Sequence, residues 1–227
     1  AVQSRLIARK LAAGRKKIGW KIGLTSRAMQ DALKIDTPDS GVLLDDMAFD
    51  NGATVPAGRF IQPRVEAEIA FAMKAPLAGA DCTRQDVLAA TDYVAPSLEI
   101  LDTRILRADP ETGKARVIVD TISDNAANAG IVLGAERHAP DVVDLRWVGA
   151  AFYRNSQIEE TGLACGVLGH PAMAIAWLAN KLAPFGTVLE PGHMMLSGSF
   201  TRPVWAAKGD TLHADFGPLG SVAVQFV

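Results

Sequence analysis

The chain has 227 residues, of which 49% are hydrophobic and 21% are charged, and its formal net charge is −2. This composition is typical of a soluble globular protein that is long enough to bury a sizeable core. It excludes the strong positive field that holds nucleic acid or an anionic membrane, so we expect neither as a partner.

The two cysteines, Cys82 and Cys165, form neither a disulfide framework nor a metal-binding motif. We recognise no signal peptide and no apolar stretch long enough to span a bilayer, and therefore expect a reduced, cytoplasmic setting. Residues 2–17 already have the amphipathic spacing of a helix with a basic polar face. Because that helix starts at once, we expect an N-terminal segment to be missing from this numbering.

Three further segments carry helix signals. Thr25 and Ser26 are suitable N-caps for a helix that ends at Leu33, and Thr83 is suitable for one that ends at Ala90. A proline at position 171 and a glycine at 186 bracket the clearest helix, over residues 172–182.

Most of the remaining chain predicts short β-strands. Residues 147–161 are typical of a hairpin with its turn at Asn155-Ser156, and Pro38-Asp39-Ser40-Gly41 predicts a turn. The other expected strands cover residues 19–24, 66–72, 93–101, 115–119, 130–133, 193–196, 204–207, 212–216 and 222–227. Strands at this density predict an α+β, β-rich fold: a mixed, sandwich-like or barrel-like sheet with a few covering helices, in one domain over residues 1–227.

Two glutamates one residue apart, Glu66 and Glu68, open one of these apolar runs. Residues i and i+2 of a strand point to the same face, so both carboxylates project side by side. Like charges at that distance repel unless a cation lies between them, and Mg²⁺ prefers oxygen ligands of this kind. Spacing alone favours two solvated residues on the outer face of an edge strand. Glu99, in a second apolar run, favours the metal site, since an unpaired buried carboxylate is expensive.

Several motifs together resemble the 2-keto-4-pentenoate hydratase family of the fumarylacetoacetate hydrolase superfamily. They fall in order along the whole chain, which makes the resemblance specific. The motifs are Lys21-Ile22-Gly23-Leu24-Thr25-Ser26, Gln62-Pro63-Arg64-Val65-Glu66-Ala67-Glu68, Asp120-Thr121-Ile122-Ser123-Asp124-Asn125-Ala126, Gly169-His170-Pro171 and Gly217-Pro218-Leu219-Gly220-Ser221.

The resemblance implies a single catalytic domain with the superfamily's mixed, barrel-like sheet. It implies a Mg²⁺ or Mn²⁺ site made by Glu66, Glu68 and Glu99, a homo-oligomer, and no organic cofactor. The substrate would be a 2-oxo acid from aromatic-compound degradation, and a neighbouring enzyme of that pathway is a possible partner. Residues 198–204 and 121–130 favour family members that hydrate 2-oxo-hept-4-ene-1,7-dioate, in homoprotocatechuate breakdown.

A 2-oxo acid can chelate a metal through its carboxylate and its ketone, and the metal then stabilises developing enolate charge. Lys21 is expected near those oxygens, either as an ammonium or as a proton donor with a lowered pKa. Asp39 is a second catalytic candidate that could move a proton, although turn aspartates are usually local caps. A lone strand lysine by itself strongly favours a solvated surface position, and the family resemblance reverses that weighting for Lys21.

The expected substrate-binding residues surround these groups. Ser197, Gly198 and Ser199 are small enough to let backbone N–H groups approach a carboxylate, or they form a plain β-bulge. Arg64 lies on the face of Glu66 if the strand extends back that far. Arg202 is the candidate that grips the second carboxylate of a dicarboxylate substrate, because the planar guanidinium forms paired hydrogen bonds.

Four alternatives compete with this interpretation of the sequence. The same chelate serves a decarboxylase of a 2-oxo-3-enedioate (4-oxalocrotonate type) or a 2-oxopent-4-enoate hydratase. Hydrolysis of an acylpyruvate needs a water-activating base, and no His-x-x-Glu accompanies the three carboxylates. A non-catalytic partner subunit is disfavoured by the intact set of Lys21 and the three glutamates.

Overall fold

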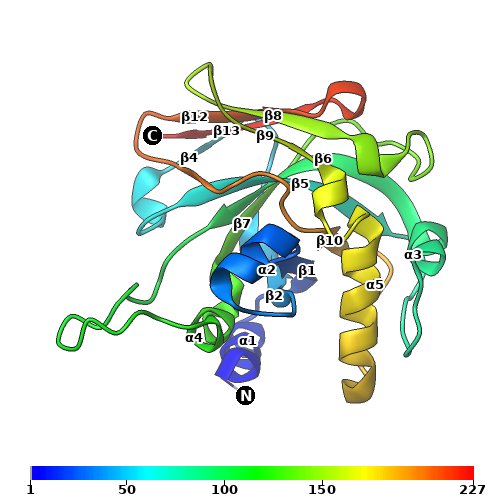
Figure 1. Ribbon diagram of the computed structural model, residues 1–227, viewed down its shortest axis with the longest axis horizontal. Coiled ribbons are helices and arrows are strands. Elements are labelled where there is room, and N and C mark those ends of the chain that lie inside the picture. The colour runs from blue at the N-terminus through cyan, green and yellow to red at the C-terminus, as the bar shows by residue number, and fades with distance from the viewer. Residues whose placement is uncertain (1) are drawn as a thin grey trace.

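The computed structural model describes residues 2–227, apart from the side chains of residues 32 and 33, and consists of two β-sheets with a few helices around them (Figure 1). The larger sheet has the order β2-β1-β10-β5-β6-β7-β3, and β11 pairs with β5. Its pairs β1–β10 and β3–β7 are parallel and the others are antiparallel, which makes the sheet mixed. The strands of this sheet are β1 (Lys17–Gly23), β2 (Asp39–Leu44), β3 (Ala48–Phe49), β5 (Arg64–Met73), β6 (Thr91–Leu101), β7 (Asn128–Leu133), β10 (Met194–Leu196) and β11 (Val204–Trp205).

The second sheet has the order β4-β13-β12-β8-β9 and lies above the first in the view of Figure 1. Its strands are β4 (Ala53–Val55), β8 (Gly149–Arg154), β9 (Gln157–Leu163), β12 (Thr211–Asp215) and β13 (Ser221–Phe226). Alternate residues of both sheets meet in one apolar core, where Phe71, Phe152, Phe216 and Phe226 are fully buried. The expected mixed, β-rich α+β fold is confirmed.

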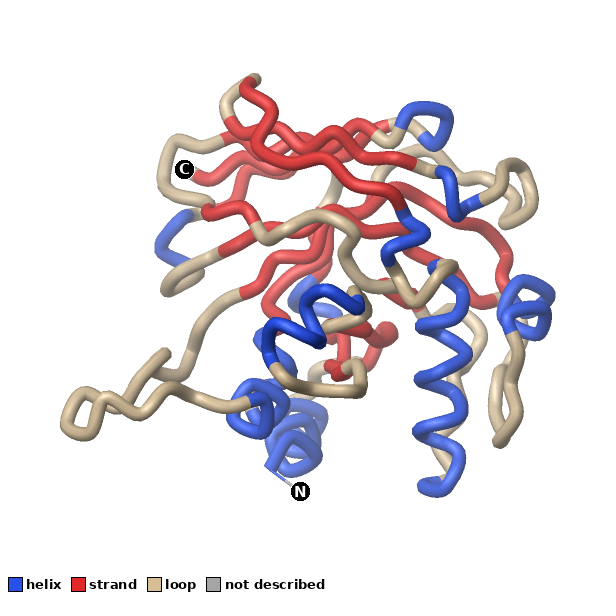
Figure 2. The backbone as a smooth tube through the Cα atoms, in the orientation of Figure 1, coloured by secondary structure: helices blue, strands red, loops and turns tan. Residues whose placement is uncertain are grey.

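Residues 2–227 form five α-helices around the sheets, which Figure 2 shows in blue together with the 3-10 helices. They are α1 (Val2–Ala12), α2 (Arg27–Leu33), α3 (Arg84–Ala90), α4 (Ile118–Ser123) and α5 (Pro171–Leu182). The Thr83 hydroxyl caps α3 by accepting the Asp86 N–H, as its position predicts. Among the described helices, none is both long and apolar enough to cross a bilayer.

Three sequence expectations are wrong. The N-terminal helix ends at Ala12 instead of continuing to residue 17, where β1 begins. The residues 38–41 form no turn: Asp39 begins β2, which pairs with β1 along its length. Residues 115–119 form no strand, because the segment leads into α4, where the Asp120 carboxylate accepts the Val117 N–H. At residues 38–41, pairing with β1 outweighs the turn composition. At residues 115–119, the start of α4 outweighs the β-branched composition.

The segment between β6 and α4 extends away from the sheets, at the lower left of Figure 1. Its residues 108 and 115 form one antiparallel bridge, which brings the two sides of the extension together. We call residues 104–117 the arm.

The expected hairpin over residues 147–161 is confirmed as β8 and β9. Asn155 and Ser156 form its turn with φ values of 51° and 66°, the left-handed conformation that two-residue hairpin turns require.

Candidate metal and 2-oxo acid site

Three carboxylates meet on one face of the larger sheet. Glu66 and Glu68 alternate along β5, and Glu99 on β6 is the direct cross-strand partner of Glu66. One oxygen from each residue can be chosen so that all three lie within 4.8 Å of one another. Glu68 and Glu99 are fully buried, and Glu66 is partly buried. The period-two prediction that Glu66 and Glu68 project from one face is confirmed, whereas the role of the three carboxylates as metal ligands stays a prediction.

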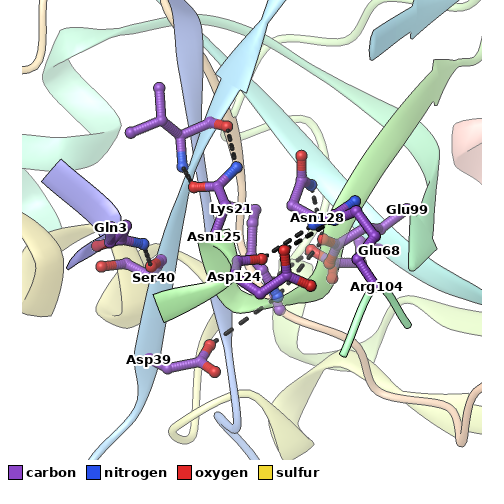
Figure 3. A network of polar contacts seen from close by, with 12 residues as sticks. Gln3, Lys21, Asp39, Ser40, Glu68, Glu99, Arg104, Asp124, Asn125 and Asn128 are labelled. Atoms are coloured by element: carbon purple, nitrogen blue, oxygen red, sulfur yellow. Dashed lines mark hydrogen bonds and ion pairs between the residues drawn. The ribbon is translucent and has the colours of Figure 1, made fainter. Parts of the chain in front are cut away.

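The register places Lys21 and Asp39 on the same face. Ala70, two residues beyond Glu68, pairs with Leu196 of β10, and Leu196 pairs with Lys21 of β1. The Lys21 ammonium lies 3.4 Å from Glu99 Oε1 and 3.9 Å from Asp39 Oδ1 (Figure 3). Both side chains are about 4% exposed. Gly23 leaves the space for this pair, since a Cβ there would collide with the Asp39 carboxylate.

The site contains more carboxylates than cationic side chains. Glu68 Oε1 and Glu99 Oε2 are buried and accept no hydrogen bond among the described residues. A buried oxygen without a partner costs roughly 1–3 kcal/mol, and more when it is charged. A divalent cation would provide both oxygens with a partner, so the donor set and its unsatisfied oxygens fit a hard metal ion.

The electrostatics follow from this imbalance. Burial, followed by the Glu99 carboxylate, raises the pKa of Glu66 to about 8. Burial, followed by the Glu99 and Glu66 carboxylates, raises the pKa of Glu68 well above its ordinary value. Burial alone would lower the pKa of Lys21, but the Glu99 and Asp39 carboxylates outweigh it and leave that pKa raised. Of the two expected states of Lys21, an ammonium or a proton donor with a lowered pKa, this direction favours the ammonium.

The loop after β10 secures Glu68. The Gly198 N–H donates a 2.7 Å hydrogen bond to Glu68 Oε2, and Gly198 has a φ of 108°, which favours glycine. The Gly198 N–H is therefore directed at a carboxylate of the protein, and the approach of this loop to a substrate carboxylate stays a prediction. The Ser199 hydroxyl donates to the Ala67 carbonyl and holds the loop against β5. Ser197 Oγ is buried and has no partner among the described residues.

Asn128 is a site residue that sequence reasoning missed. Its side-chain amide donates a 2.7 Å hydrogen bond to Glu99 Oε1, while its own Oδ1 is buried without a described partner (Figure 3). It lies at the start of β7, at an irregularity in the pairing with β6. A single asparagine before an apolar run carries no metal signal, so only the strand pairing could reveal it.

The two arginines have different surroundings. Arg64 begins β5 on the face of Glu66, as the extended strand predicts, and its guanidinium carbon lies 5.3 Å from the Trp205 ring centroid. Arg202 forms a 2.7 Å ion pair with Glu160, and 78% of its side chain is exposed. Its role as a carboxylate reader stays a prediction.

The chain resembles several characterised proteins over its whole length. It is 56% identical across 227 residues to 2-oxo-hept-4-ene-1,7-dioate hydratase of Escherichia coli, covering all of this chain and 85% of that protein. It is 38% identical across 226 residues to 2-keto-4-pentenoate hydratase of Paraburkholderia xenovorans, covering 100% of this chain and 82% of the relative. The chain belongs to the 2-keto-4-pentenoate hydratase family. No protein-family model matches it.

A solved structure shares the architecture closely. The 4-oxalocrotonate decarboxylase from Pseudomonas putida G7, complexed with magnesium and adipate, matches with a TM-score of 0.92 and 35% identity. The match covers 99% of this chain and 83% of that chain. This match confirms the expected mixed, barrel-like fold. Membership of the fumarylacetoacetate hydrolase superfamily stays an expectation from the motifs.

Proposed function

We propose that the protein is a divalent-metal-dependent hydratase that converts 2-oxo-hept-4-ene-1,7-dioate and water into 4-hydroxy-2-oxoheptanedioate. The observation that carries the proposal is the face of the sheet on which Glu66, Glu68 and Glu99 converge beside Lys21. Its buried, unsatisfied carboxylate oxygens match a hard cation, and the family members named above act on 2-oxo acids.

Each group has a proposed role. A Mg²⁺ or Mn²⁺ ion held by the three glutamates would supply Lewis-acid polarisation of the 2-oxo group. Lys21, as a buried ammonium, stabilises negative charge on the substrate oxygens as enolate character develops. Asp39, held beside Lys21, moves the proton from carbon 3 to carbon 5, which shifts the double bond into conjugation. Water then adds at carbon 4, and carbon 3 takes a proton.

The substrate's first carboxylate and ketone are proposed to lie over the glutamates. Ser197 and Gly198 form the neighbouring wall, and the unpaired Ser197 hydroxyl is free to donate to the substrate. Ser199 supports this wall through its bond to β5. The second carboxylate has two candidate cations, Arg64 and Arg202.

The test is a product analysis with 2-oxo-hept-4-ene-1,7-dioate. Protein stripped with EDTA and then given Mg²⁺ is expected to form the 4-hydroxy product without releasing carbon dioxide. Glu68→Gln, which keeps the shape but loses the charge, is expected to be inactive at the same magnesium concentration. Glu190→Gln changes an exposed carboxylate and is the matched control. Absence of any turnover by loaded wild-type protein contradicts the proposal.

Decarboxylation is the second candidate, since a decarboxylase shares this fold at a TM-score of 0.92. It would use the same chelate as an electron sink until the last step. Carbon dioxide release from a 2-oxo-3-enedioate, measured beside hydration in one reaction, separates the two activities. We further propose a homo-oligomer that works beside a neighbouring pathway enzyme; size-exclusion chromatography with light scattering tests the first part.

A further inference from the structure

Three arginines gather beside the glutamate site. Arg64 of β5 and Trp205 of β11 are direct cross-strand partners, so their side chains lie on the same face of the sheet. Arg107, from the arm, also lies over the Trp205 ring, with 4.9 Å between its guanidinium carbon and the ring centroid. Arg116 lies beside Arg107, because its backbone N–H donates a 2.9 Å hydrogen bond to the Arg107 carbonyl. We call Arg64, Arg107 and Arg116 the arginine cluster.

The cluster forms no ion pair in the described part of the chain, and the Glu66, Asp120 and Asp124 carboxylates act on it only from a longer distance. Within the described part of the chain, none of the three arginines has a carboxylate oxygen within 4.0 Å. The nearby Asp102 carboxylate is already occupied, because it accepts the N–H groups of Ile61, Gln62 and Thr103. Burial, followed by repulsion from Arg107, lowers the pKa of Arg64. Like charges at this density are costly unless an anion lies between them.

Arg64 also holds an unused donor. Its Nε is buried and has no hydrogen-bond acceptor among the described residues. Arginine normally presents Nε–H and Nη–H together to the two oxygens of one carboxylate. An unsatisfied Nε in a partly buried guanidinium is therefore the donor that such a ligand would use.

The position of the cluster fits one end of the proposed substrate. Arg64 precedes Glu66 by two residues on the same face, a separation of roughly 6.5 Å along a strand. Lys21 lies in the other direction, toward β10 and β1. A seven-carbon chain that is chelated at the glutamates has the length to reach the cluster with its far carboxylate. Arg202, by comparison, would first have to leave Glu160.

We infer that Arg64, supported by Arg107 and Trp205, binds the distal carboxylate of a dicarboxylate substrate and selects it over a monocarboxylate. This inference rests on the proposed function, because it assigns the second end of the same substrate. Arg107 contributes through the stacked arrangement on Trp205, and its effect is expected to be smaller than that of Arg64.

The experiment measures binding without turnover. Two saturated analogues that cannot be hydrated, 2-oxoheptanedioate and 2-oxopentanoate, are titrated by calorimetry into the full chain with saturating Mg²⁺. Wild-type protein is expected to bind the diacid at least tenfold more tightly. Arg64→Leu is expected to remove most of that preference, because a lost charge-assisted hydrogen bond weakens binding by about that factor. Binding of 2-oxopentanoate is expected to change less than threefold. Arg154→Leu removes a partly exposed arginine that pairs with Glu159 on the second sheet, and is the matched control.

Several results would overturn the inference. If Arg202→Leu abolishes the preference for the diacid and Arg64→Leu retains it, the distal carboxylate is bound by Arg202. Equal weakening of both analogues by Arg64→Leu means that the residue supports the metal site instead. Arg64→Lys, which keeps the charge, provides the same test if the leucine variant does not fold, and is expected to retain only part of the preference. Equal binding of both analogues by wild-type protein refutes the inference alone, whereas no binding of either refutes the proposed function.

Discussion

Replacing Lys21 with methionine should destabilise the metal-free protein strongly. The substitution keeps an unbranched side chain but removes the ammonium 3.4 Å from Glu99 and 3.9 Å from Asp39. Removing one partner of a buried ion pair costs about 3–5 kcal/mol, because the remaining charges are left uncompensated. For a chain of this size, each 1 kcal/mol lowers the midpoint of thermal unfolding by about 2–4 °C, so we expect a decrease of roughly 6–20 °C.

The loss should depend on pH and on magnesium. Glu66 has a pKa of about 8, so at pH 6 it is already protonated and part of the repulsion is absent. We therefore expect a smaller decrease at pH 6 than at pH 8.5. Bound magnesium provides a second positive charge, and should reduce the difference between variant and wild type. The variant with magnesium should fold yet lose most of its turnover, since no ammonium then faces the substrate oxygens.

The assay is thermal unfolding by circular dichroism at both pH values, once in EDTA and once with Mg²⁺ at ten times its Kd. Lys208→Met, at an exposed lysine in a turn, is the matched control and is expected to stay within about 1 °C of wild type, as surface substitutions usually do. A Lys21→Met midpoint equal to that of the control in EDTA at pH 8.5 refutes the reasoning. An equal decrease with and without magnesium also refutes it, because then Lys21 acts through packing alone.

Three further predictions concern the same site. Glu68→Gln should weaken magnesium binding at least tenfold by calorimetric titration, and unchanged affinity would remove Glu68 from the metal ligands. Metal-free protein should lose thermal stability as the pH rises from 6 to 8.5. The folded-state pKa of Glu66 is raised to about 8, so the folded protein holds a proton there that the unfolded chain has already lost, and the stability that this proton provides disappears as the pH passes about 8. A rise in stability over this range contradicts the prediction. Gly198→Ala should destabilise the fold and weaken metal binding, since its φ is 108° and a Cβ would collide with Thr25, whereas Gly166→Ala, in open space, should do neither.

The metal ligands could be predicted because a strand has a strict period. Glu66 and Glu68 are two residues apart in a run of buried residues, so a single assumption of strand structure places both on one face. Glu99 followed from the cost of burying a carboxylate alone. Neither prediction depends on which strands pair, and the structure places all three carboxylates together as both predictions require.

Features that depend on pairing could not be predicted in the same way. Asp39 lies in a sequence with turn composition, but β1 supplies the hydrogen-bond partners that make it a strand residue. Asn128 reaches Glu99 only because β7 lies beside β6. Arg107 lies far along the arm, and nothing local in its sequence indicates that it meets Trp205. Long-range register, which sequence periodicity does not encode, decides all three.

The same register gives the face a charge gradient that matches a dianionic 2-oxo acid. One end holds carboxylates in excess over Lys21, which a divalent cation can convert into a positive site for the chelating end of the substrate. The other end holds arginines in excess over carboxylates, which remains positive without a metal. Loss of the metal should therefore abolish binding of 2-oxopentanoate but leave weak, salt-sensitive binding of a simple dicarboxylate at the arginine cluster. Calorimetric titration of pimelate into EDTA-treated protein at low salt measures this residual binding, and its persistence in Arg64→Leu would place the anion elsewhere.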